Sequence, residues 1–497
     1  MPRHRGPGAV DTPLPIARHL ARVALEDRPE PRTVCDPAAG DGRLLASVAD
    51  LCSGSPTLFG ADVDAATWRH GPLGGASSAH FAHVDALGRQ PSELWDAAPT
   101  GGIDLVVGNP PFLSQLARGS TRSDDQRRRV SRLDGAVRTL TDTAAAFLLQ
   151  ACDMLAPGGR VAMILPLSFL STRDSAPVRR RVLETCRLSG IWVSDGSVFP
   201  GVDVETCAVV LDRCEDAPAV VKRWRGDTFE SVASVRVGSD ELVAAPTWSH
   251  LVSDALDRVP PIDLSGSEGR LGDIAGATAG FRDQFYGLAP LVVEHCDRGA
   301  GTGADRVRVL TSGSIDPGCA LWGRRPARIA GRDLLAPVLD VQAVEPPRLA
   351  SWVEARRVPK VLVATQTRVV EAVADPTGEH LPLTPVVSVE PAPDDLWRAL
   401  AVLLAPPVSL WARRGFAGAA RSPRSIKLSA QQVLQAPLPA DRPAWQRAAD
   451  DLETAHQVER GGVAREAVLA AAATMCSAYG VGAEVHEWWR AQLPERR

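Results

Sequence analysis

Apolar positions in roughly the first 215 residues switch repeatedly between helical and strand-like spacing. Helical spacing covers Pro15–Leu25, Leu44–Leu51 and Thr143–Leu155, and Pro157-Gly158-Gly159 is a stop signal after the last of these. Short apolar runs predict strands at Arg32–Asp36, Thr57–Ala61, Ile103–Val107, Arg160–Leu165 and Cys207–Leu211. Strands that alternate with helices predict an open α/β sheet, mostly parallel and covered by helices on both faces.

The pattern changes after about residue 215, where prolines become frequent and the regular alternation is lost. The end of the chain, Trp445–Leu493, has helical spacing. The chain is also too long for one ordinary core. We therefore expect a first domain at residues 1–215, a connecting segment at 216–245 and a mixed α/β domain with a helical end at 246–497.

Composition places the chain among soluble globular proteins, with 45% hydrophobic and 23% charged residues in 497. No apolar run approaches the roughly 20 residues of a membrane span, and the first residues lack the apolar core of a secretory signal. The nine cysteines are scattered without a Cys-x-x-Cys pair, which indicates reduced thiols. We expect a cytoplasmic protein with no metal site and no membrane contact.

The formal net charge of −4 does not indicate a nucleic-acid protein, although a local basic face can exist within such a total. An arginine-rich stretch, Arg118–Arg138, follows one of the motifs below. It fits two interpretations equally well: a loop that tracks phosphates, or ordinary solvated surface.

The segment Val34–Leu45 (VCDPAAGDGRLL) joins a predicted strand to a predicted helix. Gly40 and Gly42 allow a tight turn that approaches a ligand closely, and Asp36 can accept a hydrogen bond from a ligand's ammonium group. With Pro37 and Ala38, these residues form the first part of a candidate cofactor site, although an ordinary strand-to-helix turn would look similar.

Two acidic residues follow at the ends of the next strands. Asp62 is placed to bind both hydroxyls of a ribose, and Val63 to pack on an adenine ring, while Asp64 is the expected helix cap. Asp85, beside Ala86, is placed to accept from an adenine amino group. A solvent-exposed turn is an equally good interpretation of Asp85.

The run Asp104–Phe112 (DLVVGNPPF) leads a buried-type strand into Asn109-Pro110-Pro111-Phe112. Prolines lack N–H donors, so this turn offers mainly acceptors: the Asn109 side-chain oxygen and the Pro110 carbonyl. An aromatic amino group is a poor nucleophile because its lone pair is delocalised. Two acceptors on its N–H bonds favour a pyramidal nitrogen that can accept a methyl group, and Phe112 can stack on the base.

Together these segments resemble the N6-adenine DNA methyltransferases whose cofactor motifs precede a C-terminal target-recognition domain. The resemblance includes Thr12-Pro13 before the first helix and the segment Val198–Leu211, and it covers about 200 residues in order. It implies a Rossmann-like domain that binds S-adenosylmethionine, with Thr12 in the cofactor site and Phe199 packed on the other face of a flipped base. Double-stranded DNA is the implied partner, with a separate restriction or defence subunit as a further candidate.

The second half resembles recognition domains more loosely, at Gly276–Phe281, Ile329–Leu334 and Leu434–Pro439. Ala39, Asp41 and Phe112 depart from residues common in the family. Other hypotheses remain: methylation of RNA, of a protein glutamine or of cytosine N4, and a non-catalytic DNA-binding subunit.

Overall fold

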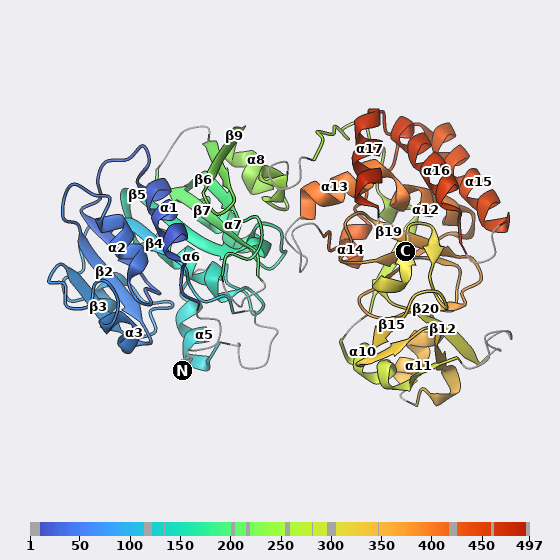
Figure 1. Ribbon diagram of the computed structural model, residues 1–497, viewed down its shortest axis with the longest axis horizontal. Coiled ribbons are helices and arrows are strands. Elements are labelled where there is room, and N and C mark those ends of the chain that lie inside the picture. Colours follow the sequence, from blue (N-terminus) through green and yellow to red (C-terminus); the bar gives the residue numbers. More distant parts are fainter. Residues whose placement is uncertain are drawn as a thin grey trace. The chain divides into compact units, whose positions relative to one another are not determined.

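The computed structural model describes most of the chain (Figure 1). The described residues are 10–113, 122–133, 135–199, 204–214, 219–253, 259–280, 282–295, 305–345, 347–416, 425–458 and 462–493. They divide into two compact units, the first ending near residue 257 and the second containing most of the remainder. None of the described helices has the length and apolarity needed to cross a membrane.

The first unit is built on one sheet with strand order β3-β2-β1-β4-β5-β7-β6-β8-β9. The strands are β1 (Thr33–Asp36), β2 (Thr57–Asp62), β3 (Ala79–His83), β4 (Ile103–Gly108), β5 (Leu155–Pro166), β6 (Arg187–Val193), β7 (Thr206–Asp212), β8 (Ala219–Arg225) and β9 (Glu230–Val237). The helices are α1 (Leu14–Leu25), α2 (Arg43–Ala49), α3 (Ala65–Arg69), α4 (Pro91–Leu94), α5 (Asp124–Val130), α6 (Thr143–Met154), α7 (Ala176–Val182) and α8 (Ser239–Ala244).

Strand directions create a place for a ligand at one edge of this sheet. β1 pairs in parallel with both β2 and β4, so the strand order reverses between β1 and β4. In open α/β sheets ligands bind outside the carboxyl ends of the strands at such a reversal. The loops that follow β1 and β4 therefore meet there. They contain the Asp36–Gly42 segment and Asn109.

The sheet is buried on both faces because its strand residues alternate between two cores. Val34 and Leu105 join α1 and α2 in one cluster, whereas Cys35 and Val106 join α6 and α7 in the other. In Figure 1 helices lie on both sides of the sheet. The predicted α/β fold, mostly parallel and covered on both faces, is confirmed.

The expected domain boundary differs from the structure. Residues 219–237 of the predicted connecting segment form β8 and β9, which continue the first sheet, and α8 follows them. β9 is the edge strand of the sheet, and its residues are exposed or half-buried except for Val237. The shift in composition near residue 215 marks the edge of the sheet, and the first unit continues to about residue 257.

The second unit is mixed α/β, as expected, with a helical end. One antiparallel sheet has the order β10-β21-β18-β19 and another sheet the order β11-β17-β12-β20. The strands are β10 (Ala275–Ala279), β11 (Val292–Glu294), β12 (Arg306–Leu310), β13 (Ile315–Asp316), β14 (Cys319–Ala320), β15 (Ala327–Ile329), β16 (Arg332–Leu334), β17 (Pro337–Asp340), β18 (Lys360–Ala364), β19 (Glu371–Asp375), β20 (His380–Pro382) and β21 (Val387–Pro391). The helices are α10 (Arg282–Leu288), α11 (Pro347–Glu354), α12 (Leu396–Leu404), α13 (Pro406–Phe416), α14 (Ala430–Val433), α15 (Arg442–Val458), α16 (Arg465–Ala478) and α17 (Ala483–Gln492).

Candidate active site

Asp36 ends β1 and is almost completely buried, with 1% of its surface exposed. Its Oδ1 accepts a hydrogen bond from the Ala38 amide at 3.0 Å. Burial raises the pKa of Asp36 to about 8, and the negative charges of Asp62 and Asp41 add to this, although the Ala38 bond opposes it. Among the described residues no cation influences this buried carboxyl group, so it is suited to receive one, such as a ligand's ammonium group.

Gly40 and Gly42, in the loop after β1, differ in the space around them. Gly42 has φ +81° and an added Cβ would lie 2.9 Å from the Trp68 ring, so packing excludes a side chain there. Gly40 has φ +53°, but no protein atom lies within 4 Å of an added Cβ. The backbone at Gly40 therefore faces open space, as a loop that approaches a ligand requires.

Asp62 connects the end of β2 to this loop. Its Oδ2 accepts from the Gly40 amide and its Oδ1 from the Asp64 amide, both at 2.9 Å. Asp64 caps α3 through the amides of Ala66 and Thr67, which confirms its predicted role. The Val63 side chain is 64% exposed, so it is free to pack on a ring.

Asp85 follows β3, but its carboxylate already has protein partners. Oδ2 accepts from Gln126 Nε2 at 2.9 Å and from Arg129 Nη2 at 2.6 Å, and Oδ1 accepts from the Leu87 amide. Gln126 and Arg129 both belong to α5. In this arrangement Asp85 holds α5 against the loop after β3, so its predicted contact with an adenine amino group competes with an ion pair.

Asn109 lies directly after β4, where it is held in one orientation. Its Nδ2 donates to the Val10 carbonyl at 3.2 Å and to Thr12 Oγ1 at 3.1 Å. A carbonyl can only accept, so the amide nitrogen must face Val10 and Oδ1 must point the other way. Thr12 is itself fixed, since its carbonyl accepts from Arg43 Nη1 at 2.7 Å. Thr12 thus links the Asn109 turn to α2, which begins at Arg43.

The aromatic residues predicted to enclose a base are brought together. The Phe112 and Phe199 ring centroids lie 6.2 Å apart with an interplanar angle of 82°. Phe199 is 2% exposed, and Phe112 is half-buried. The two rings meet edge to face, so a base between them requires one ring to rotate towards a parallel arrangement.

Two residues that support the site had no role in the sequence-based prediction. Asp142 caps α6 through the Ala144 amide and also accepts from the backbone N–H of Leu113, directly after Phe112. Burial raises the pKa of Asp142. Gln150, also on α6, binds the loop that follows Asp85. Its signal in the sequence was a single amide within a mostly apolar helix.

The described part of the arginine-rich stretch contains buried arginines with structural partners as well as exposed ones. Arg118 lies outside the described residues. Arg122 and Arg129 are only 6% and 8% exposed and bind protein groups. Arg127 and Arg128 pair with aspartates of their own helix.

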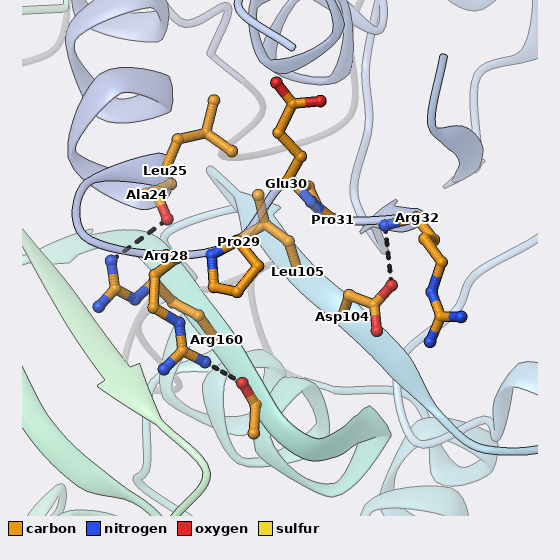
Figure 2. Close-up of a pocket in the computed structure, with 11 residues that line it drawn as sticks. Ala24, Leu25, Arg28, Pro29, Glu30, Pro31, Arg32, Asp104, Leu105 and Arg160 are labelled. Atoms are coloured by element: carbon orange, nitrogen blue, oxygen red, sulfur yellow. Dashed lines mark hydrogen bonds between the residues drawn. The ribbon is translucent and has the colours of Figure 1, made fainter. Parts of the chain in front are cut away.

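A small pocket of about 200 Å³ lies at the opposite edge of the sheet, near the beginnings of β1, β4 and β5. Figure 2 shows its polar groups bonded to one another: the Arg32 amide donates to Asp104, and Arg160 donates to the Ala24 carbonyl. Arg160 also pairs with Asp212. These bonds fix the end of α1, so this pocket is structural and the candidate site remains at the carboxyl edge.

Comparison with known families gives a match at the first unit. Residues 3–228 match the family model described as N-6 DNA Methylase. The matched range covers both the loop after β1 and the Asn109 turn, together with β8.

Similar solved structures include a restriction-modification enzyme and a methyltransferase subunit. The type IIL restriction-modification enzyme MmeI, solved in complex with DNA, has 10% identity and a TM-score of 0.59, with 93% of this chain and 73% of that chain covered. The type I methyltransferase subunit from Streptococcus thermophilus has 18% identity and a TM-score of 0.37, with 47% of this chain and 50% of that chain covered. The chain thus spans about half the length of that subunit. The MmeI comparison shows a similar fold across both units.

Proposed function

We propose, from the match of residues 3–228 to the N-6 DNA methylase family, that the chain methylates the N6 amino group of adenine in DNA. The observation that carries the proposal is the orientation of Asn109. Its amide nitrogen is bound by Val10 and Thr12, so its oxygen is presented as an acceptor at the carboxyl edge of the sheet.

The loop after β1 fits S-adenosylmethionine as the methyl donor. The buried Asp36 carboxyl would bind the ammonium group, and the open backbone at Gly40 would approach the ligand closely. Asp62 would bind the ribose hydroxyls beside the exposed Val63. When bound, this cofactor supplies an electrophilic methyl group. Pro37, Ala38, Gly42, Asp85 and Ala86 complete the proposed surroundings, together with Thr12.

Two acceptors then activate the target amino group. Asn109 Oδ1 and the Pro110 carbonyl would each accept a hydrogen bond from one N–H of the target amino group. This arrangement favours a pyramidal nitrogen with an available lone pair. The same oxygens stabilise the positive charge that develops on the nitrogen during transfer. Preorganised groups of this kind usually contribute strongly because they need no reorganisation during the reaction.

The target base would reach this turn by leaving the DNA helix, at a cost of a few kcal/mol. Stacking on an aromatic ring contributes about 1–3 kcal/mol per base, so Phe112 and Phe199 together can offset this cost. Pro111 fixes the backbone from which Phe112 projects.

Double-stranded DNA is the proposed partner, and the second unit is the proposed recognition domain. The fold similarity to an enzyme solved with DNA extends over 93% of this chain, which supports this assignment. A separate restriction or defence subunit is a further candidate partner.

The substitution Asn109→Ala tests the assignment. It should lower methyl transfer to DNA by about 10²–10³-fold, the usual loss when one preorganised polar contact is removed. Transfer of tritium from labelled S-adenosylmethionine to duplex DNA measures the rate, and calorimetry measures cofactor binding, which should remain within a few-fold. Gln90→Ala, which removes an exposed amide elsewhere in this unit, should change neither. Near-normal transfer by Asn109→Ala would remove this residue from the mechanism.

A further inference from the structure

A polar groove of about 890 Å³ lies within the second unit. It is bordered by the turn between β18 and β19, by the β13 region and by the end of α17. The polar side chains used below are Asp316, Arg325, Gln366, Arg368 and Glu371. The proposed methyltransferase chemistry uses none of them.

The backbone of the β18–β19 turn is held rigidly. The Gln366 and Thr367 amides both donate to the Ile426 carbonyl, at 2.9 and 3.3 Å, and the Ile426 amide donates back to the Thr367 carbonyl at 2.6 Å. Thr365 Oγ1 donates to the Pro385 carbonyl at 2.9 Å. Gln366 has φ +70°, a conformation that a side chain other than glycine adopts at an energetic cost. The fold thus places a glutamine where glycine would be favoured.

The side chains of this turn differ in their partners. Thr367, which lies between Gln366 and Arg368, turns inwards, where its hydroxyl donates to the Val369 carbonyl at 2.5 Å. Gln366 and Arg368 are exposed, and the described residues provide no hydrogen bond or ion pair to either side chain. A fixed backbone with two uncommitted side chains two residues apart is preorganised for contact with a ligand outside the chain.

Among the described charged side chains that line the groove, Arg368 has no ion-pair partner, and the two acids do not offset its charge. Asp316 is paired with Arg325 at 2.9 Å. Burial raises the pKa of Glu371 to about 8, with a further contribution from the charge of Asp316, so Glu371 is largely uncharged at neutral pH. A polyanion can approach this groove without facing unpaired carboxylates.

We propose that Gln366 and Arg368 read base edges in the major groove of the target DNA. The inference rests on the proposed function, because it takes DNA as the substrate. A glutamine amide matches the acceptor and donor pair of adenine, and the guanidinium fork of arginine matches the two acceptors of guanine. The recognition sequence should therefore contain an adenine specified by Gln366 and a guanine specified by Arg368.

Selection from a random duplex library, followed by sequencing of the bound and of the methylated molecules, tests this inference with the full chain. Gln366→Gly removes the side chain while suiting the positive φ, so folding should be retained. It should relax one adenine position, and Arg368→Ala should relax one guanine position, each by about 10–100-fold in base preference. Gln342→Ala and Arg447→Ala remove exposed residues of the same types elsewhere in this unit and should leave the motif unchanged.

The possible outcomes separate this inference from the proposed function. An unchanged bound motif in both variants would overturn the readout. A uniform loss of binding to all sequences, with a weaker salt dependence, would also overturn it, because that is the behaviour of phosphate contacts. Selective binding that the variants relax, without methylation by the parent, would keep the readout and reject the proposed enzyme.

Discussion

At the scale of single residues, Asn109 is the most informative position in the chain. It is the only asparagine among 497 residues. The chain does not otherwise use this side chain for caps or turns, where it is usually common. The residue occurs where the proposed chemistry needs an oriented acceptor next to a proline carbonyl. A turn alone would not require asparagine there.

Asp36 leads to a prediction about stability and pH. Its pKa of about 8 in the folded protein lies far above the roughly 3.9 of an unfolded chain. Between these values the folded state binds a proton that the unfolded state has released, so this group makes the free protein less stable as pH rises from about 4 to 8. Asp36→Asn should therefore raise the Tm of the free protein near pH 8 and flatten the decline of Tm between pH 5 and 8.

The same substitution should abolish measurable binding of S-adenosylmethionine, because the amide cannot pair with an ammonium group. Differential scanning calorimetry and titration calorimetry provide the two measurements. Asp50→Asn, at an exposed site after α2, is the control and should change neither. A lower Tm for Asp36→Asn, or full cofactor affinity, would mean that Asp36 is a structural carboxylate.

At the scale of elements, α6 fixes two loops of the site. Asp142 at its start binds the amide of Leu113 after the Asn109 turn. Gln150 lies inside it and is 1% exposed. Its Nε2 donates to the Ala86 and Arg89 carbonyls at 2.8 Å, and its Oε1 accepts from the Gly88 amide at 2.9 Å. The amide satisfies three backbone groups of one loop.

Gln150→Leu should lower the free energy of unfolding by about 1–3 kcal/mol, because buried backbone groups lose their partners. Denaturant unfolding followed by circular dichroism provides this measurement. Asp153→Asn, on the exposed side of the same helix, should stay within about 0.5 kcal/mol of the parent. A neutral Gln150→Leu variant would show that water or the loop itself satisfies these groups.

The sequence predicted most elements of the first unit because their periodicity is strong. The strand predicted at Ile103–Val107 is β4, and the helix predicted at Thr143–Leu155 is α6. β8 and β9 were assigned to a connecting segment, because β9 is a largely exposed edge strand whose composition resembles that of a linker. The partner of Asp85 could not be predicted either. Arg129 lies 44 residues away and meets Asp85 only through the packing of α5.

At the scale of the whole molecule, the account assigns chemistry to the first unit and sequence choice to the second. The first unit has the family match and the Asn109 turn, and the second has the groove with Gln366 and Arg368. This division is a proposal, and the similarity to MmeI across both units concerns the fold alone. In this division, the residues proposed for methyl transfer lie at the ends of strands in the first unit. The residues proposed to recognise bases lie on the β18–β19 turn of the second unit.

The most direct test of the central claim is the identity of the methylated product. The protein should be incubated with duplex DNA and S-adenosylmethionine labelled in the methyl group, and the DNA digested to nucleosides for mass spectrometry. We predict labelled N6-methyladenine with the parent protein and none with Asn109→Ala. Label in N4-methylcytosine, in RNA or in protein, or no labelled product from any of these substrates, would contradict it.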